Sequence, residues 1–160
     1  VSGNDFSSSE LDKAKPSLIM FICNHCPYVI HYHDEIKRLA NDFDNTINMV
    51  AISSNDIKEY PQDGPDKMRE LWEGLGLSFP YLFDSTQDVA KQYKAECTPE
   101  FYLFDSSHKL VYRGRLDESS PNSGSEPTGK DLRNAIENML NNEEVNPDQF
   151  PSMGCNIKWK

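Results

Sequence analysis

The chain has 160 residues, with 26 acidic and 16 basic side chains and a net charge of −10. This length suits one domain with its own core, and the acidic balance gives no electrostatic reason to bind phosphate backbones or anionic lipid. Because the longest apolar run, Leu18 to Cys23, is far shorter than the ~20 residues of a membrane helix, we expect a soluble protein without nucleic-acid or membrane partners.

The first third of the chain predicts a strand followed by a helix. Residues 1–16 are polar and include three consecutive serines, so we expect a loosely attached lead-in. The run from Leu18 to Ile22 is apolar throughout, as in a strand covered on both faces. Pro27 favours a helix start, because the backbone N–H that proline lacks would have no partner within the helix at its first position. Apolar residues at three- and four-residue steps extend this helix to about Phe43.

The middle of the chain predicts a second strand and a second helix. Met49 to Ile52 is apolar and is followed by polar residues, so it completes a strand-helix-strand unit. A helix is expected to begin near Pro65 and to end at Gly74 or Gly76. The acidic residues between 63 and 66 are expected to lie on the solvated surface.

The following segment predicts a short strand, a helix and a hairpin. Phe79 to Phe83 has the pattern of a strand. Ser85 and Asp88 resemble a capping box, which would open a helix. Phe101 to Phe104 and Leu110 to Tyr112 flank a turn-like stretch and are predicted to pair as antiparallel neighbours.

The C-terminal part predicts a loop, a helix and a tail. Asp117 to Thr128 is rich in Ser, Pro, Gly and Asn, so we expect a mobile loop. Thr128 and Asp131 resemble a capping box for a last helix. Residues 141–160 are expected to form a docked tail, held by apolar side chains near its end. The order of these elements indicates an α/β domain with a mixed sheet and helices on both faces.

Cys23-Asn24-His25-Cys26 lies where the first predicted strand gives way to its helix. Unpaired N–H groups and the helix dipole stabilise an anion at that position, and the thiolate is the reactive form in disulfide exchange. A Cys-x-x-Cys pair in this context is typical of thioredoxin-like redox sites. There are two alternatives. The cysteines could be inert thiols of the core, or they could bind a metal together with His25, as in a copper-delivery module. Protonated His25 would tune the pair by stabilising a thiolate.

Three segments resemble the peroxiredoxin-like branch of the thioredoxin superfamily, which is related to the alkyl hydroperoxide reductase and thiol-specific antioxidant group. They are MFICNHCPYV at residues 20–29, CTPEFYLFD at residues 97–105, and the final PSMGCNIKWK. The resemblance implies a single thioredoxin-fold domain over residues 1–160, with a central mixed β-sheet flanked by helices on both faces. It also implies that Pro99 is a cis-proline facing the cysteine pair, and that Thr98 offers its backbone to an extended thiol substrate.

One departure from the peroxiredoxins bears on activity. They hold the peroxidatic cysteine with a Thr three residues before it and an Arg supplied from elsewhere, whereas Cys23 occupies the place of that Thr if Cys26 is the counterpart. Arg113 and Arg115 are present, but nothing in the sequence brings either of them to the thiols. A thiol-disulfide oxidoreductase is therefore the leading prediction, and a thiol peroxidase is the alternative.

The other two cysteines each have two interpretations. Cys97 lies two residues before Pro99, where it would either resolve a mixed disulfide or pack as a small buried hydrophobe. Cys155 lies in the tail, which favours a structural role over a resolving thiol. Between the paired cysteines, the thioredoxin arrangement favours Cys23 as the attacking thiol in disulfide exchange, whereas Pro27 makes Cys26 the N-cap and the candidate for peroxide chemistry.

The expected partners are protein or small-molecule thiols and disulfides, with peroxide as an alternative substrate, and we expect no cofactor and no bound metal. Four cysteines without a dense framework are unlike a small disulfide-rich secreted domain. We therefore expect a cytoplasmic protein that contributes to cell redox homeostasis. The sequence opens on Val1, which leaves room for a targeting segment removed before it.

Overall fold

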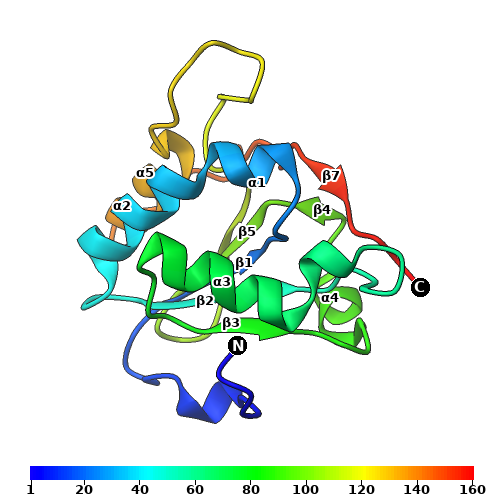
Figure 1. Cartoon of the computed structure of the whole chain (residues 1–160). Helices are drawn as coiled ribbons and strands as arrows, with labels where there is room; N and C mark the ends of the chain where they lie inside the picture. Colours follow the sequence, from blue (N-terminus) through cyan, green and yellow to red (C-terminus); the bar gives the residue numbers. More distant parts are fainter.

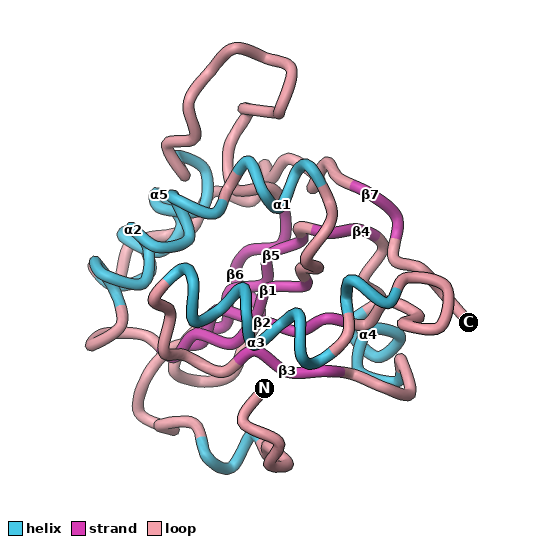
Figure 2. Tube along the Cα trace, in the orientation of Figure 1, coloured by secondary structure: helices cyan, strands magenta, loops and turns pink.

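The computed structural model describes all 160 residues. A five-stranded sheet in the order β3-β2-β1-β5-β6 forms its centre (Figures 1 and 2). β1 (Ser17–Phe21), β2 (Asn48–Ser53) and β3 (Tyr81–Phe83) run parallel, whereas β5 (Glu100–Phe104) is antiparallel to both β1 and β6 (Leu110–Gly114). The predicted mixed sheet and the hairpin between its last two strands are confirmed.

Side chains along β1 alternate between the two faces of the sheet, as the pleat requires. Leu18 and Met20 belong to the larger buried cluster, whereas Ile19 and Phe21 belong to the smaller one on the other face. Helices cover both faces, which explains why Leu18 to Phe21 are all apolar.

Four helices cover the larger cluster, and one short helix covers the smaller cluster on the other face (Figure 1). On the larger side lie α1 (Pro27–His31), α2 (His33–Phe43), α3 (Pro65–Leu75) and α5 (Lys130–Leu140), and on the smaller side α4 (Asp88–Tyr93). The helix from Pro65 is confirmed, and it ends at Gly76, whose φ of 68° is left-handed.

The helix predicted from Pro27 to Phe43 is divided in two at Tyr32. The segment from Tyr28 to Phe43 contains neither glycine nor proline, the usual sources of a break. The Tyr32 side chain is buried, and its hydroxyl donates to the carbonyl of Ser119 at 2.8 Å. This distant contact holds the chain at the break, so the interruption could not be predicted from local pattern.

The capping box predicted at Ser85 and Asp88 is wrong. α4 begins after Gln87, which has a left-handed φ of 66° and makes no side-chain cap. Instead, the carboxylate of Asp84 accepts hydrogen bonds from the N–H groups of Val89 and Ala90 at 3.4 and 3.0 Å. The first turn is therefore capped by a residue at the end of β3.

The capping box predicted at Thr128 and Asp131 is also wrong, because α5 follows Gly129 and has no side-chain cap within it. The buried carboxylate of Asp117 accepts from the N–H groups of Thr128 and Gly129, both at 2.7 Å. The loop that was predicted to be mobile is thus tied together at its two ends by one side chain.

The chain ends make specific contacts. The Val1 ammonium donates to the carbonyl of Tyr81 at 2.7 Å, and Phe6 packs against the smaller cluster. Near the C-terminus, β7 (Cys155–Asn156) pairs antiparallel with β4 (Cys97–Thr98) in a separate two-stranded sheet. Figure 1 shows this pair beside the start of α1. None of the helices is both long and apolar enough to cross a bilayer.

Candidate active site

The cysteine pair lies between the end of β1 and the start of α1. Cys26 is the N-cap residue of α1, and Pro27 is its first residue, as predicted. Cys23 is 1% exposed and Cys26 is 0% exposed. The thiols therefore lie at a helix N-terminus, as the motif predicted, but both residues are buried.

Thr98 faces both thiols from the strand that precedes the proline. Its Oγ1 lies 3.4 Å from the Cys23 sulfur, and its carbonyl oxygen lies 3.3 Å from the Cys26 sulfur. The Thr98–Pro99 peptide bond is cis, which confirms the sequence-based prediction. The structure thus brings Thr98 to the two cysteines, from which it is 75 and 72 positions away in the chain.

The surroundings separate the pKa values of the two thiols. Hydrogen bonding with Cys26 and burial raise the pKa of Cys23. Hydrogen bonding from Cys23 lowers the pKa of Cys26; burial opposes this shift, and contacts with Cys155 and the backbone N–H of Val29 reinforce it. The sequence favoured Cys23 as the attacking thiol, whereas these directions favour Cys26, the sulfur that is more readily a thiolate.

Cys155 joins the pair from the tail. Its sulfur lies 2.8 Å from the sulfur of Cys26. Burial and hydrogen bonding with Cys26 raise the pKa of Cys155, which describes a neutral thiol that donates to the Cys26 thiolate. The tail position had favoured a purely structural role, and only the pairing of β7 with β4 reveals this proximity.

Cys97 lies near the group but contacts no thiol at hydrogen-bond distance. Its sulfur approaches the carbonyl oxygens of Pro99 and Ser152, each at 3.9 Å. Burial raises the pKa of Cys97 to about 12. These contacts favour the interpretation of Cys97 as a packed thiol.

Asp63 was expected on the solvated surface, and that expectation is wrong, because its side chain is fully buried. It accepts from the backbone N–H of Asn24 at 2.8 Å and from the side-chain amide of Asn55 at 2.9 Å. Its charge also contributes to the raised pKa of Cys23, after the hydrogen bond with Cys26, burial and the opposing bond with Thr98. The carboxylate therefore holds the Cys-x-x-Cys loop in place.

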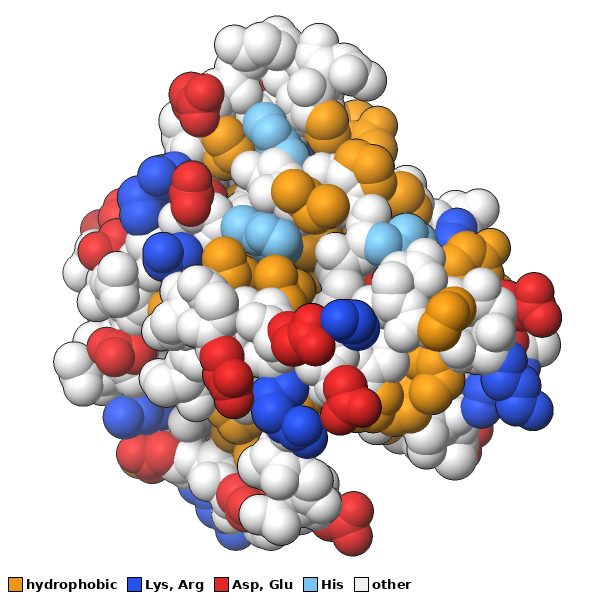
Figure 3. All heavy atoms as spheres, in the orientation of Figure 1, with side chains coloured by type: hydrophobic (Ala, Val, Ile, Leu, Met, Phe, Trp, Pro, Cys, Tyr) orange, Lys and Arg blue, Asp and Glu red, His pale blue; other side chains and the backbone are white.

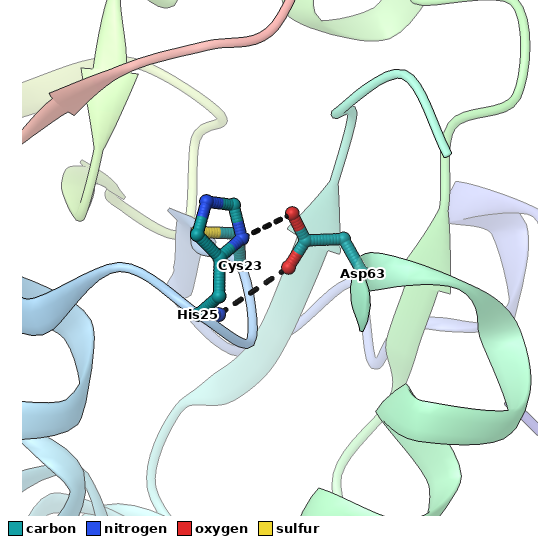
Figure 4. Close-up of side chains that lie close together, drawn as sticks. All are labelled: Cys23, His25 and Asp63. Carbon is teal, nitrogen blue, oxygen red and sulfur yellow. Dashed lines mark hydrogen bonds and ion pairs between the residues drawn. The ribbon is translucent and has the colours of Figure 1, made fainter. Parts of the chain in front are cut away.

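His25 faces Asp63 (Figure 4): its Nδ1 lies 2.6 Å from the Asp63 carboxylate. The ring also stacks on Tyr60 at 5.5 Å and 9°. Cys23, His25 and Asp63 present possible ligand atoms within 4.8 Å of one another. The Asp63 carboxylate already accepts hydrogen bonds from Asn24 and Asn55 and lies against the His25 ring, so its oxygens are engaged within the protein.

The two arginines considered for peroxide chemistry lie elsewhere. Arg113 donates to Glu100 at 2.9 Å, and Arg115 donates to Asp131 at 2.7 Å. Neither makes a hydrogen bond or ion pair with a cysteine.

The surface over α1 is partly apolar. Ile30 is 51% exposed and Met153 is 44% exposed. Figure 3 shows histidine and hydrophobic side chains side by side over this region of the molecule.

A family model described as Redoxin matches residues 1–132. Two crystal structures are similar over 99% of this chain, each with a TM-score of 0.95. One is an uncharacterized conserved protein from Geobacillus kaustophilus, with 49% identity and 85% of that chain covered. The other is a hypothetical protein from Sinorhizobium meliloti 1021, with 39% identity and 87% of that chain covered.

A third similar structure is a thioredoxin-like protein solved in solution in its oxidized form. It has 19% identity and a TM-score of 0.69, and the match covers 90% of this chain and 89% of the other. The two chains therefore share the thioredoxin fold. No curated protein matches the sequence.

Proposed function

The chain belongs to the Redoxin family, in the peroxiredoxin-like branch of the thioredoxin superfamily, and from this premise we propose that it is a thiol-disulfide oxidoreductase that cycles Cys23 and Cys26. The coarser conclusion, a thiol-redox protein, follows from the family. The observation that carries the finer proposal is the placement of the cysteine pair at the start of α1, with Cys26 as the N-cap residue and Thr98 facing both sulfur atoms. Hydrogen bonding from Cys23 is the largest contribution to the lowered pKa of Cys26, which agrees with this role.

In the proposed cycle, the reduced pair passes two electrons and two protons to a substrate disulfide. The products are a Cys23–Cys26 disulfide and two substrate thiols. Cys26 is the more reactive sulfur in both directions, because a thiol of low pKa is present as thiolate at neutral pH and also leaves readily when its disulfide is attacked. Cys23 is the neutral thiol that completes the disulfide.

The contacts around Cys26 favour this function over a thiol peroxidase. Peroxide chemistry of the peroxiredoxin type uses an arginine next to the reactive thiolate, and Arg113 and Arg115 are instead engaged by Glu100 and Asp131. The groups that surround Cys26 are two thiols and the carbonyl of Thr98. Such a set suits exchange between sulfur atoms.

The test is the reduction of insulin by dithiothreitol in the presence of the protein and its variants. We expect the wild type to accelerate precipitation of the insulin B chain, and both Cys26→Ser and Cys23→Ser to lose that acceleration. Cys97→Ser is the matched control, because its sulfur makes no hydrogen bond to another thiol, and it should retain the wild-type rate.

A wild type that does not accelerate insulin reduction, and whose pair stays reduced in oxidised glutathione, would contradict the proposal. In a parallel measurement, consumption of hydrogen peroxide that is rapid and lost in Cys26→Ser would favour the peroxidase instead, with trapping of a sulfenic acid to locate the oxidised residue.

A further inference from the structure

The proposed function raises a question of access. Cys23 and Cys26 have essentially no exposed surface, so an external thiol or disulfide cannot reach either sulfur directly in this conformation. Cys155 is partly exposed and lies 2.8 Å from the Cys26 sulfur. It is the one cysteine in contact with both the buried pair and the outside.

Cys155 belongs to a segment that is anchored at both ends, residues 151–156, here called the strap. Before the strap, the carbonyl of Phe150 accepts from the N–H of Arg115 at 3.1 Å. After it, Ile157 is 3% exposed within the smaller core cluster, and the N–H of Lys158 donates to Asn55 at 2.9 Å. Cys155 is therefore held at the site by its neighbours rather than placed there by a loose chain end.

The strap occupies the strand edge next to the cis-proline. β7 pairs with β4 so that Cys155 lies opposite Thr98, the residue that the family resemblance assigns to backbone pairing with an extended thiol substrate. The approach is so close that a Cβ at Gly154 would overlap the carbonyl oxygen of Thr98. The strap thus places a cysteine against Cys26 in the geometry expected of a bound substrate peptide.

We propose that Cys155 is a third redox-active thiol, which forms a disulfide with Cys26 and is the sulfur that external thiols attack. This inference rests on the proposed function, because it describes how the buried pair exchanges with its substrates. The Cys155 thiolate attacks the Cys26 sulfur of the Cys23–Cys26 disulfide. The Cys26–Cys155 bond forms, the Cys23–Cys26 bond breaks, and Cys23 takes up the proton that Cys155 lost, with no net oxidation.

An external thiol then completes the transfer. Its thiolate attacks Cys155, the partly exposed sulfur, and Cys26 leaves as a thiolate. The product is a mixed disulfide on Cys155, from which a second external thiol releases an external disulfide and restores the Cys155 thiol. Two external thiols are oxidised and the protein gains two electrons. The same steps in reverse oxidise the protein. Attack at Cys155 is favoured for two reasons: Cys155 is the exposed sulfur of the Cys26–Cys155 disulfide, and Cys26 is a stable leaving thiolate.

The first experiment maps the disulfide in Cys23→Ser. The reduced variant is treated with oxidised glutathione, quenched with acid, blocked with N-ethylmaleimide and digested with trypsin without reductant. Cleavage separates Cys26, in residues 14–37, from Cys155, in residues 134–158. We expect these two peptides to be linked. A glutathione adduct on Cys26 with no such link would overturn the proposal.

The second experiment measures how fast glutathione reduces the oxidised protein. Cys155→Ser keeps both members of the buried pair, and we expect its Cys23–Cys26 disulfide to form but to be reduced roughly tenfold more slowly than in the wild type, because the accessible sulfur is missing. Cys97→Ser is the control and should be reduced at the wild-type rate. Circular dichroism checks that each variant is folded.

The outcomes separate this inference from the proposed function. If the Cys23–Cys26 disulfide forms in Cys155→Ser and is reduced at the wild-type rate, the role of Cys155 is wrong and the oxidoreductase stands. If no disulfide forms in the wild type at any glutathione ratio, both fail. Should Cys155→Ser not fold, direct mapping of the wild type decides, because a Cys26–Cys155 link at partial oxidation is expected and its absence contradicts the inference.

Discussion

At the scale of single residues, the site depends on the difference between the pKa values of the two paired thiols: the pKa is raised for Cys23 and lowered for Cys26. Pro27 makes Cys26 the N-cap, and that part could be predicted. The sulfur makes no capping hydrogen bond of ordinary geometry, so the low pKa of Cys26 comes chiefly from Cys23, with help from Cys155. The second contact joins residues 129 positions apart, and no local pattern indicates it.

The position of Asp63 also could not be predicted from the local sequence. Its spacing among neighbouring acidic residues is typical of a solvated surface, yet its carboxylate is fully buried beneath the cysteine loop. Donors from two separate segments, Asn24 and His25 in the cysteine loop and Asn55 after β2, offset the cost of burying it. Only the packing of the η2 turn (Pro61–Asp63) against the loop brings them together.

The first prediction concerns alkylation of the reduced protein by iodoacetamide between pH 5 and 9. The pKa of Cys26 is lowered, chiefly by hydrogen bonding from Cys23, so its thiolate persists as the pH falls. Peptide mapping should therefore show Cys26 labelled before Cys23 at pH 6, although slowly because the strap covers it. Cys97, whose pKa is about 12, should label only towards the alkaline end. Preferential labelling of Cys23 at pH 6 would reverse the assignment.

At the scale of elements, strands were easier to predict than helix ends. Strand residues are apolar on both faces, which is visible in the sequence. Both predicted capping boxes failed because an aspartate outside the box holds the start of the helix. Asp84 accepts from the N–H of Ala90 in the first turn of α4, and Asp117 accepts from the N–H of Gly129, the N-cap residue of α5. A cap supplied from a neighbouring strand or loop has no fixed spacing from the helix that it caps.

The second prediction tests, through Asp117→Asn, the hydrogen bonds that hold Thr128 and Gly129 just before α5. Burial opposes ionisation, but hydrogen bonds from Ser119, Gly129 and Thr128 lower the pKa of Asp117. Its stabilisation is therefore present above the unfolded pKa of about 3.9 and is lost as the pH falls through the folded value. We expect the variant to lose about 2 kcal/mol at pH 7, and the difference to shrink towards pH 2.

Urea denaturation at pH 7 and at low pH measures this difference. Glu118→Gln, at the exposed neighbouring carboxylate, is the matched control and should change stability by no more than about 0.5 kcal/mol. A penalty for Asp117→Asn that is independent of pH would show that its charge plays no part.

The third prediction concerns the strap. In Gly154→Ala the new Cβ would overlap the carbonyl of Thr98, so we expect a loss of about 1 to 3 kcal/mol and faster labelling of Cys26 by iodoacetamide at pH 7 as β7 separates from β4. Gly74→Ala is the control, because a Cβ there meets nothing within 4 Å, and it should stabilise α3 by about 0.5 to 1 kcal/mol. Unchanged labelling of Cys26 in Gly154→Ala would mean that the strap does not limit access.

At the scale of the whole molecule, the sequence predicted the sheet, the faces of the helices and the position of the Cys-x-x-Cys pair. It could not predict the full site, which is assembled from four separate parts of the chain: the loop after β1, the η2 turn, the strand edge at Thr98 and the strap. The parallel and antiparallel order of the strands brings the first three to one end of the sheet. The tail then crosses them, a contact that depends on tertiary packing alone.

The central claim is that Cys23 and Cys26 form a reversible redox pair with a stabilised Cys26 thiolate. Its most direct test is the reduction potential of the pair, measured by equilibrating the protein with glutathione buffers and mapping the thiols. Because a low thiol pKa stabilises the reduced form, we predict a potential less negative than the about −270 mV of thioredoxin. A pair that never oxidises across the glutathione range, or a potential more negative than that of thioredoxin, would contradict the account.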